Sequence, residues 1–377
     1  MFHYLFAMLN VKIISDYQSF TAMKEAWNEL VADSWKNYVF FTHEWYDCWW
    51  QAFGQNNELF ILAAEDTDRP GQLLAIAPFM TCKTTMRGLP VQTIQFMAND
   101  DSPRCDLIVR KKVTDAEQLC ESILDAIRSS KIKWDLLFLD NIEKDSTYLQ
   151  AFMKVFGRKG LKHTSQPKIS SPWLPIGQDW DAYYGSLSRR LKMTVNNVRN
   201  RLQKLGDVEI EELDDADQLS EMSTISKNAW KYLEGKSFLN REDRKNFFIL
   251  LSQAARAQGW LSLWMLRING KPVAYEYHLR YDGKEVALLA EFDQEYYKNS
   301  PGTFLDFYII KKLHEMGVTE YDLGGSLDQY KTKWKPNLRN TEDYYVYNSI
   351  LLYIVERWFV SVLRTIRQKV SSISDKK

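Results

Sequence analysis

Three short apolar segments separated by hairpin turns constrain the fold of this chain more than any other feature. Strands are expected at 261–268, 272–281 and 285–292, and the turns between them are Asn269-Gly270 and Asp282-Gly283. Asn-Gly and Asp-Gly are preferred two-residue hairpin turns, because both central residues need a positive φ. The segment is therefore predicted to form an antiparallel three-stranded meander.

A helix is predicted directly after the meander, over 301–316. Ser300-Pro301-Gly302 suits its start, since serine is a good N-cap and proline fits the first helical turn, and Gly317 suits its end. The elements expected further along are a strand at 320–323, the pair Gly324-Gly325, a short helix at 330–335 and a strand at 344–347.

The first part of the chain is predicted to follow the same order of elements. Those elements are helices within 17–53, strands at 59–65, 73–81 and 91–97, a helix at 115–129, a strand at 135–139 and a helix at 146–157. The segment Ser165–Pro175 holds three prolines and three serines and is predicted to be a linker.

A chain of 377 residues exceeds one ordinary hydrophobic core, so two domains are expected. We predict domains at 1–165 and 166–348, followed by a tail at 349–377. The predicted fold class is α/β (α+β), with a mixed, mostly antiparallel sheet flanked by helices in each domain.

Composition narrows the classes of function. The chain has 49 Lys plus Arg and 49 Asp plus Glu, and a zero net charge argues against a dedicated DNA-binding protein. Five scattered histidines do not predict a metal site. The four cysteines lack C-x-x-C spacing and are expected to be free thiols in a reducing cytoplasm; they are Cys48, Cys82, Cys105 and Cys120.

The chain shows no sequence signal for secretion or membrane spanning. The apolar start 1–9 has no Lys or Arg before it and no small-residue cleavage site, so it is a poor signal peptide. No segment reaches the roughly 18 uninterrupted apolar residues of a spanning helix. We therefore expect a cytoplasmic protein that is soluble or peripheral to the inner membrane.

The start of the helix after the meander is the best candidate for a ligand site. Backbone N–H groups at a helix N-terminus are unpaired and carry partial positive charge, which suits a phosphate. Gly302 would let a ligand approach the backbone closely. Ordinary helix capping by Ser300 and Pro301 is the alternative interpretation.

Two segments carry a resemblance to a known family, FDQEYYKNSPGTFL (292–305) and YDLGGSLDQYKTKW (321–334). With the order of elements, they resemble acyltransferases related to the GNAT fold and to FemAB-type peptidoglycan aminoacyltransferases. They are most similar to the branch found with bacterial cellulose and exopolysaccharide synthesis genes. The matching residues here are Ser300-Pro301-Gly302, Asp322, Gly324 or Gly325, Tyr330-Lys331 and Trp334.

The resemblance implies tandem GNAT-like halves, with the donor site in the second half and a degenerate one in the first. It implies acetyl-CoA or another acyl-CoA as the donor, and no metal. The glycine loop of standard acetyltransferases is reduced here to Ser-Pro-Gly, and aminoacyl-tRNA is the alternative donor. The residues expected to bind the donor are Phe292, Asp293, Asn299, Ser300, Pro301, Gly302 and Thr303.

A basic helix over 188–205 also matches the family, where such a helix opens the second half. It holds six basic residues and no acid, and its apolar residues fall on one helical stripe. Its charges are either a solvated face or a wall for a phosphate-bearing acceptor. The expected substrate-binding residues are Arg190, Arg199, Lys331 and Trp334.

Acyl transfer needs a base for the acceptor and a proton for the leaving group. Glu291 ends an apolar strand, where burial would suit a base; its alternative role is pairing with a basic neighbour. Asp322 is the second candidate base, and Tyr330 could give a proton to a leaving thiolate. The sequence favours direct transfer over a covalent intermediate.

The tail at 349–370 is predicted to be an amphipathic, basic helix. It either packs on the domain or lies on an anionic membrane surface, where Trp358 and Phe359 would be anchors. We expect N- or O-acyl transfer to a small-molecule or lipid-linked sugar of the cell envelope or an exopolysaccharide. The alternatives are a FemAB-type aminoacyl-tRNA-dependent transferase and a non-catalytic, membrane-peripheral accessory protein of polysaccharide synthesis.

Overall fold

The computed structural model describes residues 9–69, 71–177, 179–214 and 219–359. The first half follows the predicted order and adds β1 at its start. Its elements are β1 (Leu9–Ile14), α1 (Tyr17–Ala22), α2 (Lys24–Ala32), η1 (Val39–Phe41), α3 (His43–Phe53), β2 (Glu58–Asp66), β3 (Leu73–Met86), β4 (Leu89–Phe96), β5 (Ile108–Val109), α4 (Ala116–Ser129), β6 (Leu136–Glu143), α5 (Thr147–Arg158) and β7 (Lys162–Pro175).

The second half contains the predicted meander, which is β9, β10 and β11. Its elements are α6 (Trp180–Ser186), α7 (Arg189–Gln203), β8 (Val208–Leu213), α8 (Leu219–Lys227), α9 (Trp230–Leu233), η3 (Phe238–Asn240), α10 (Glu242–Ala257), β9 (Leu261–Ile268), β10 (Lys271–Tyr281), β11 (Lys284–Phe292), η4 (Gln294–Asn299), α11 (Pro301–Glu315), β12 (Glu320–Asp322), α12 (Gln329–Thr332) and β13 (Asn337–Tyr347).

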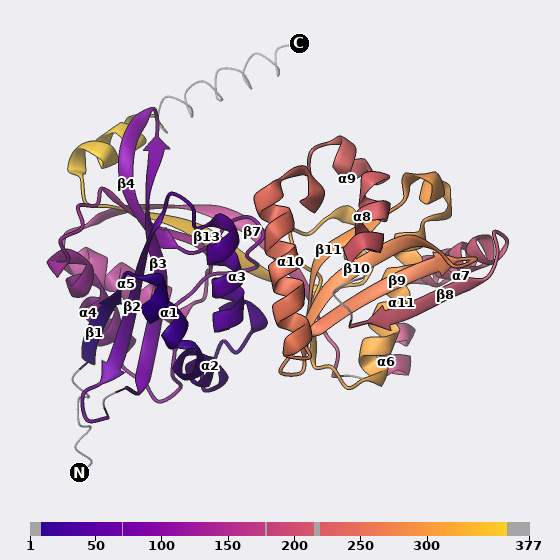
Figure 1. Ribbon diagram of the computed structural model, residues 1–377, viewed down its shortest axis with the longest axis horizontal. Helices are drawn as coiled ribbons and strands as arrows, with labels where there is room; N and C mark the ends of the chain where they lie inside the picture. The colour runs from indigo at the N-terminus through magenta and orange to yellow at the C-terminus, as the bar shows by residue number, and fades with distance from the viewer. Residues whose placement is uncertain (1–8, 70, 178, 215–218, 360–377) are drawn as a thin grey trace.

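One sheet runs through both halves, with helices on its faces (Figure 1). Its strand order is β1-β2-β3-β4-β6-β13-β7-β12-β11-β10-β9-β8, with β5 paired to β3. Most neighbouring strands are antiparallel, and the exceptions are β4 with β6 and β11 with β12. The predicted fold class, a mixed and mostly antiparallel sheet flanked by helices, is confirmed.

The predicted linker at Ser165–Pro175 is wrong, because this segment lies inside strand β7. β13 pairs with β7 along most of its length and with β6 on its other side. Pro167 and Pro172 lie where β7 has only β13 as a neighbour, since β12 pairs only with 173–175. Proline is tolerated on an unpaired strand edge, so its presence did not mark a loop.

The two halves also share a hydrophobic core. Residues of α2 and α3 in the first half and of α8 and α10 in the second belong to one buried cluster. At its centre the ring of Trp45 meets the ring of Phe247 edge-on, with centroids 5.3 Å apart. Figure 1 shows α3 and α10 facing each other across the junction. Because the sheet and this core cross it, the division at 165/166 stays a prediction.

The described part of the tail is helical over 350–359. Leu352 is buried, and Glu356 accepts two hydrogen bonds from Arg87 at 2.8 and 2.9 Å, which fixes one face of the helix to the first half. The remaining predicted tail, 360–377, lies outside the described residues, as do residues 1–8 of the apolar start. None of the helices in the described ranges has the length and apolar character needed to cross a bilayer.

Candidate active site

Two parallel strands separate at the point where the candidate site opens. β11 and β12 pair only between 284–286 and 320–322, and β11 then continues to Phe292 with β10 as its only strand neighbour. Gly324 lies where the chain leaves β12, with φ +67°, and a Cβ there would lie 2.1 Å from the carbonyl oxygen of Ala287. Only glycine allows this close approach, so the predicted glycine pair marks the end of pairing.

A cavity of about 540 Å³ lies where the strands diverge. It holds six of the predicted site residues, which are Glu291, Phe292, Ser300, Gly302, Thr303 and Tyr330. Its other lining residues are Trp230, Lys231, Tyr275, Glu276, Ala290, Gln294, Tyr297, Leu305, Asp306 and Asp328. The end of β11, the start of α11 and α12 therefore meet around one cavity, as the two family-like segments predicted.

The start of α11 differs from the predicted capping geometry. Ser300 has a left-handed backbone with φ +56°, and its hydroxyl makes no capping hydrogen bond. A Cβ at Gly302 would meet only Phe292, at 3.8 Å, so packing does not demand a glycine there. Lys333 Nζ donates to Thr303 Oγ1 at 3.0 Å and adds a positive charge beside the helix start. This corner of the cavity is suited to a phosphate or another anion.

Several other predicted residues lie behind the cavity wall. Asp293 caps η4, where its carboxylate accepts from the Glu295 N–H, and Pro301 is buried in the first turn of α11. Trp334 is fully buried, and its indole N–H donates to Asp306 Oδ2 at 3.3 Å. Asn299 is the last residue of η4. These residues shape the site without lining it.

Two lysines lie within or beside the cavity. Lys231 Nζ donates to the carbonyl of Ala290 at 2.9 Å; burial lowers the pKa of Lys231, and the Glu291 carboxylate opposes this effect. Lys331 is buried and donates to the carbonyls of Gly324 and Ser326. Burial also lowers the pKa of Lys331. Both ammonium groups are held by backbone carbonyl oxygens, which keeps them close to the cavity.

Glu291 lies inside the cavity as predicted, and Tyr330 lines its mouth. The Glu291 carboxylate is buried and accepts from Ser237 Oγ at 3.3 Å. Burial raises the pKa of Tyr330, so its hydroxyl stays protonated and able to donate. Both placements fit the roles expected from the sequence, and those roles stay predictions.

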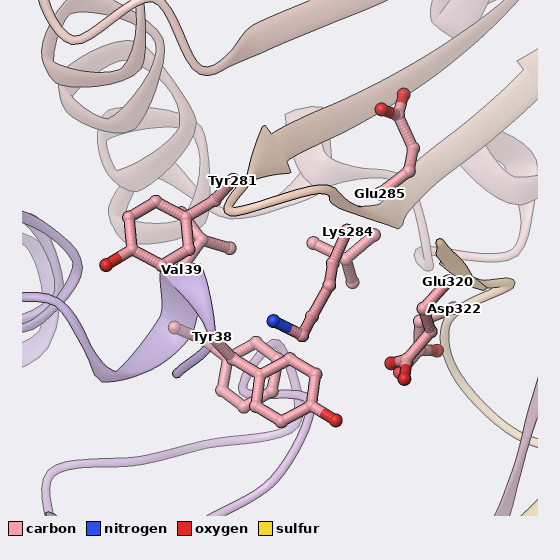
Figure 2. Close-up of a pocket in the computed structure, with 9 residues that line it drawn as sticks. Tyr38, Val39, Tyr281, Lys284, Glu285, Glu320 and Asp322 are labelled. Carbon is pink, nitrogen blue, oxygen red and sulfur yellow. The ribbon is translucent and has the colours of Figure 1, made fainter. Parts of the chain in front are cut away.

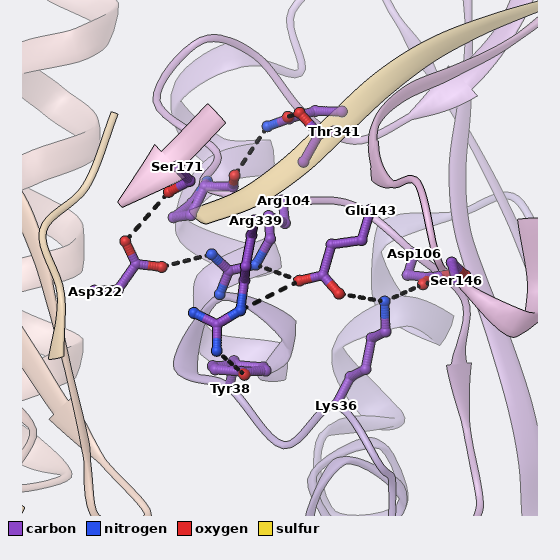
Figure 3. A network of polar contacts seen from close by, with 12 residues as sticks. Lys36, Tyr38, Arg104, Asp106, Glu143, Ser146, Ser171, Asp322, Arg339 and Thr341 are labelled. Atoms are coloured by element: carbon purple, nitrogen blue, oxygen red, sulfur yellow. Dashed lines mark hydrogen bonds and ion pairs between the residues drawn. The ribbon is translucent and has the colours of Figure 1, made fainter. Parts of the chain in front are cut away.

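Asp322 lies outside this cavity, in a buried polar network between the two halves (Figure 3). Arg104 donates to Asp322 and, at 3.0 Å, pairs with Glu143, which also pairs with Lys36. Burial alone would raise the pKa of Asp322, but Arg104 outweighs it and holds the pKa below its usual range. A carboxylate neutralised in this way is poorly suited to be a base, and we give Asp322 a structural role.

A second cavity beside this network is too small for a substrate. It measures about 10 Å³ and lies between Tyr38 and Val39 of the first half and Lys284, Glu320 and Asp322 of the second (Figure 2). Such a volume is about that of one water-sized probe. The junction is therefore packed at this point and offers no room for a substrate.

The corresponding gap in the first half is filled by protein. β4 and β6 are parallel and pair only between 93–95 and 136–138. Past that point Cys105 bridges to Ile142, and the Asn141 side chain donates to the carbonyls of Ser102 and Pro103. The degenerate donor site expected in the first half stays a prediction.

Sequence reasoning missed two carboxyls in the cavity, Glu276 and Asp306. Glu276 lies in the apolar run VAYEYHL of β10, and Asp306 lies in the first turns of α11. A charged residue within an otherwise apolar strand was the available signal, because such residues are seldom buried without a partner.

The basic helix α7 forms as predicted, with its apolar stripe of Leu191, Val195, Val198 and Leu202 buried. It packs against α11 and η4, next to the cavity. Arg190 and Arg199 are exposed, and no ion pair joins either of them to another described residue. Their placement is that of a charged face beside the site rather than of cavity-lining residues.

Comparison with known proteins finds a family match over the part of the chain that forms the cavity. Residues 189–332 match the family model of the acetyltransferase (GNAT) domain. This segment, less than half of the chain, is similar to GNAT-type acyltransferase domains. The matched range runs from α7 to α12 and includes every residue that lines the cavity. No curated protein sequence matches the chain.

Solved structures with little sequence identity share the fold over most of the chain. FemX has 14% identity and a TM-score of 0.62, covering 88% of this chain and 98% of its own. The C-terminal domain of a putative lysylphosphatidylglycerol synthetase from Agrobacterium fabrum has 12% identity and a TM-score of 0.53, covering 91% and 97%. L-PGS from Bacillus licheniformis has 13% identity and a TM-score of 0.52, covering 90% and 95%.

Proposed function

We propose that the protein transfers an acyl group from an acyl-CoA, with acetyl-CoA as the simplest donor, to a sugar of a cell-envelope or exopolysaccharide precursor. The observation that carries the proposal is the cavity between the end of β11 and the start of α11. It combines an open helix N-terminus at Gly302 with a buried carboxylate at Glu291 and a protonated phenol at Tyr330.

The chemistry of the lining supports direct transfer. The free N–H groups of α11 and the ammonium of Lys333 suit the phosphates of a donor. A carboxylate of the cavity would take a proton from the acceptor, the leaving thiolate would receive one, and Lys331 would stabilise negative charge nearby. Glu291 and Tyr330 are the residues that the sequence suggested for the two proton transfers. The acceptor would enter past the exposed rings of Trp230 and Tyr297.

Calorimetric titration with acetyl-CoA tests the donor. The wild-type chain is expected to bind, and Gly302→Leu should weaken binding at least about tenfold, because its side chain would enter the cavity. Gly157→Leu is a matched control, since Gly157 also lies in a helix, in α5, with open space at its Cβ position. Absence of binding by the wild type, or equal binding by Gly302→Leu, would overturn the proposed donor.

The exposed face of α7 favours a second donor, aminoacyl-tRNA, which the FemAB-type resemblance implies. Arg190 and Arg199 are exposed on α7, which packs against η4, and arginine is well suited to phosphates. Filter binding of aminoacyl-tRNA by the double variant Arg190→Ala/Arg199→Ala, compared with Arg128→Ala on the remote helix α4, would separate this donor from acyl-CoA. Binding that only the double variant loses would support it.

We also propose a cytoplasmic protein that contacts the inner membrane through its tail. Ile350, Leu351, Ile354 and Trp358 are 56–66% exposed, and their spacing places them on one face of the helix. The sequence after residue 359 adds Arg364, Arg367 and Lys369, which favour an anionic surface. A non-catalytic accessory protein would share this surface, and only acyl-transfer activity distinguishes it.

Sedimentation with vesicles tests the tail. Trp358→Ser should reduce the fraction bound to anionic vesicles, and Leu205→Ser, an exposed apolar residue elsewhere, should not. Equal binding by the wild type and Trp358→Ser would contradict a membrane role for this face.

A further inference from the structure

Two carboxyl groups meet on one wall of the cavity. Glu276 comes from β10 and Asp306 from α11, and both line the cavity. Glu276 is 4% exposed, and the side chain of Asp306 is 14% exposed. The negative charge of Glu276 lies close enough to raise the pKa of Asp306.

Glu276 pairs with a buried histidine of its own strand. His278 Nε2 lies 3.0 Å from Glu276 Oε2, and His278 Nδ1 lies 3.1 Å from Glu285 Oε1. Burial disfavours the imidazolium, but hydrogen bonds to these two carboxylates outweigh it and raise the pKa of His278 to about 9. The hydroxyl of Tyr321 also donates to Glu276, at 3.4 Å. Glu276 therefore faces the imidazolium of His278.

Asp306 has weaker partners, and its pKa lies near neutrality. It accepts one hydrogen bond from the indole of Trp334 at 3.3 Å, and Lys333 Nζ lies 3.6 Å away. Burial, and then the neighbouring Glu276, raise the pKa of Asp306 to about 7. A group that titrates near neutrality can both accept and return a proton under working conditions.

We propose that Asp306 carries the proton during acyl transfer, and that Glu276 and His278 position it. This inference rests on the acyl transfer proposed above. The acceptor nitrogen or oxygen forms a bond to the acyl carbon, and the C–S bond of the donor breaks. The acceptor proton passes to the Asp306 carboxylate and from there to the leaving thiolate. The products are an amide or ester and a free thiol.

A third carboxylate, that of Glu291, lies on another wall of the cavity. Glu291 lies on β11 beside Ala290, to which Lys231 is bonded, and it accepts from Ser237. It can therefore orient the acceptor while Asp306 handles the proton. The titratable and charged groups that face Asp306 are Tyr183 of α6, Glu276 of β10, Tyr321 of β12, Tyr330 and Lys331 of α12, and Lys333.

The test compares Asp306→Asn with Glu315→Gln, which changes an exposed carboxylate on the same helix. Thiol release from acetyl-CoA is measured from pH 5 to 10 with a panel of amino and neutral sugars as acceptors. Wild type and Glu315→Gln should show kcat rising through an apparent pKa near 7. Asp306→Asn should lose this step and about 100-fold in kcat, while calorimetry shows unchanged affinity for acetyl-CoA.

The variant Glu276→Gln tests whether Glu276 controls the pKa of Asp306, because a purely structural role of Glu276 would leave that pKa unchanged. Removing its negative charge lowers the pKa of Asp306, so the inflection of the kcat profile should shift to lower pH. Infrared difference spectra between pH 5 and 9 should show a protonated-carboxyl band that disappears in Asp306→Asn. Asparagine can still accept from Trp334 and donate to Glu276, so this variant is expected to fold.

The outcomes separate the two proposals. A wild-type kcat and pH profile in Asp306→Asn would overturn the role of Asp306 and leave acyl transfer standing. A wild-type protein that neither binds acetyl-CoA nor releases thiol would overturn the proposed function, and the role of Asp306 with it. An Asp306→Asn protein that has lost affinity for acetyl-CoA would contradict a role limited to proton transfer.

Discussion

Single residues in this protein carry charge in places where few charges are stable. His278 is completely buried on β10 between Glu276 and Glu285. Sequence reasoning selected Glu291 because it ends an apolar strand and Tyr330 because it lies within a family-like segment. It could not place Glu276, His278 or Asp306, because their proximity depends on how β10 and α11 pack.

The protonation of His278 should be visible as a pH dependence of stability. Its pKa is about 9 in the folded protein and about 6.5 when unfolded. The stabilisation is therefore complete below pH 6.5 and is lost as pH rises through 9. The free energy of unfolding should fall by about 3 kcal/mol over this range. Urea unfolding at several pH values measures it, and His278→Gln should lack this step. An equal decline in both proteins would contradict the assignment.

At the scale of elements, local turns could be predicted from the sequence, whereas pairing between strands far apart in the sequence could not. The meander was predicted closely because Asn269-Gly270 and Asp282-Gly283 specify its hairpins within a few residues. β7 was mistaken for a linker because its partner β13 lies far along the chain. Proline and serine composition describes local preference, and pairing at this distance overrode it.

Gly324 should be the most sensitive glycine of the candidate site. Gly324→Ala places a methyl group against the Ala287 carbonyl, whereas Gly317→Ala has the same left-handed backbone with open space. The control should be destabilised by about 1–2 kcal/mol through its backbone alone. Gly324→Ala should lose about 1–3 kcal/mol more because of overpacking. Urea unfolding of both variants measures the difference, and equal losses would show that the contact at Ala287 relaxes freely.

At the scale of the whole molecule, the halves are joined by a sheet, a hydrophobic core and a buried polar network. Arg104 and Asp322 lie 218 residues apart in the sequence and form the centre of that network. The sequence showed Asp322 within a family motif, but nothing in it indicated a partner from the first half. Its expected role as a base therefore could not be checked until the fold was known.

The network should make the halves unfold together. Arg104→Ala leaves Asp322 and Glu143 without their buried cation and should cost about 3–5 kcal/mol. Arg158→Ala, which removes a half-exposed surface pair with Glu117, should cost less than about 1 kcal/mol. Circular dichroism and tryptophan fluorescence should report one coincident transition in urea for the wild type. Separate transitions would show that the junction does not couple the halves.

The position of β13 in the sheet has a consequence for how the chain is made. β13 is the last strand of the described sequence, yet it lies between β6 and β7, near the middle of the sheet. A ribosome releases the partners of this strand long before residues 337–347. During synthesis, β6 and β7 therefore exist before the strand that pairs between them. This part of the sheet can form only after residues 337–347 have been made.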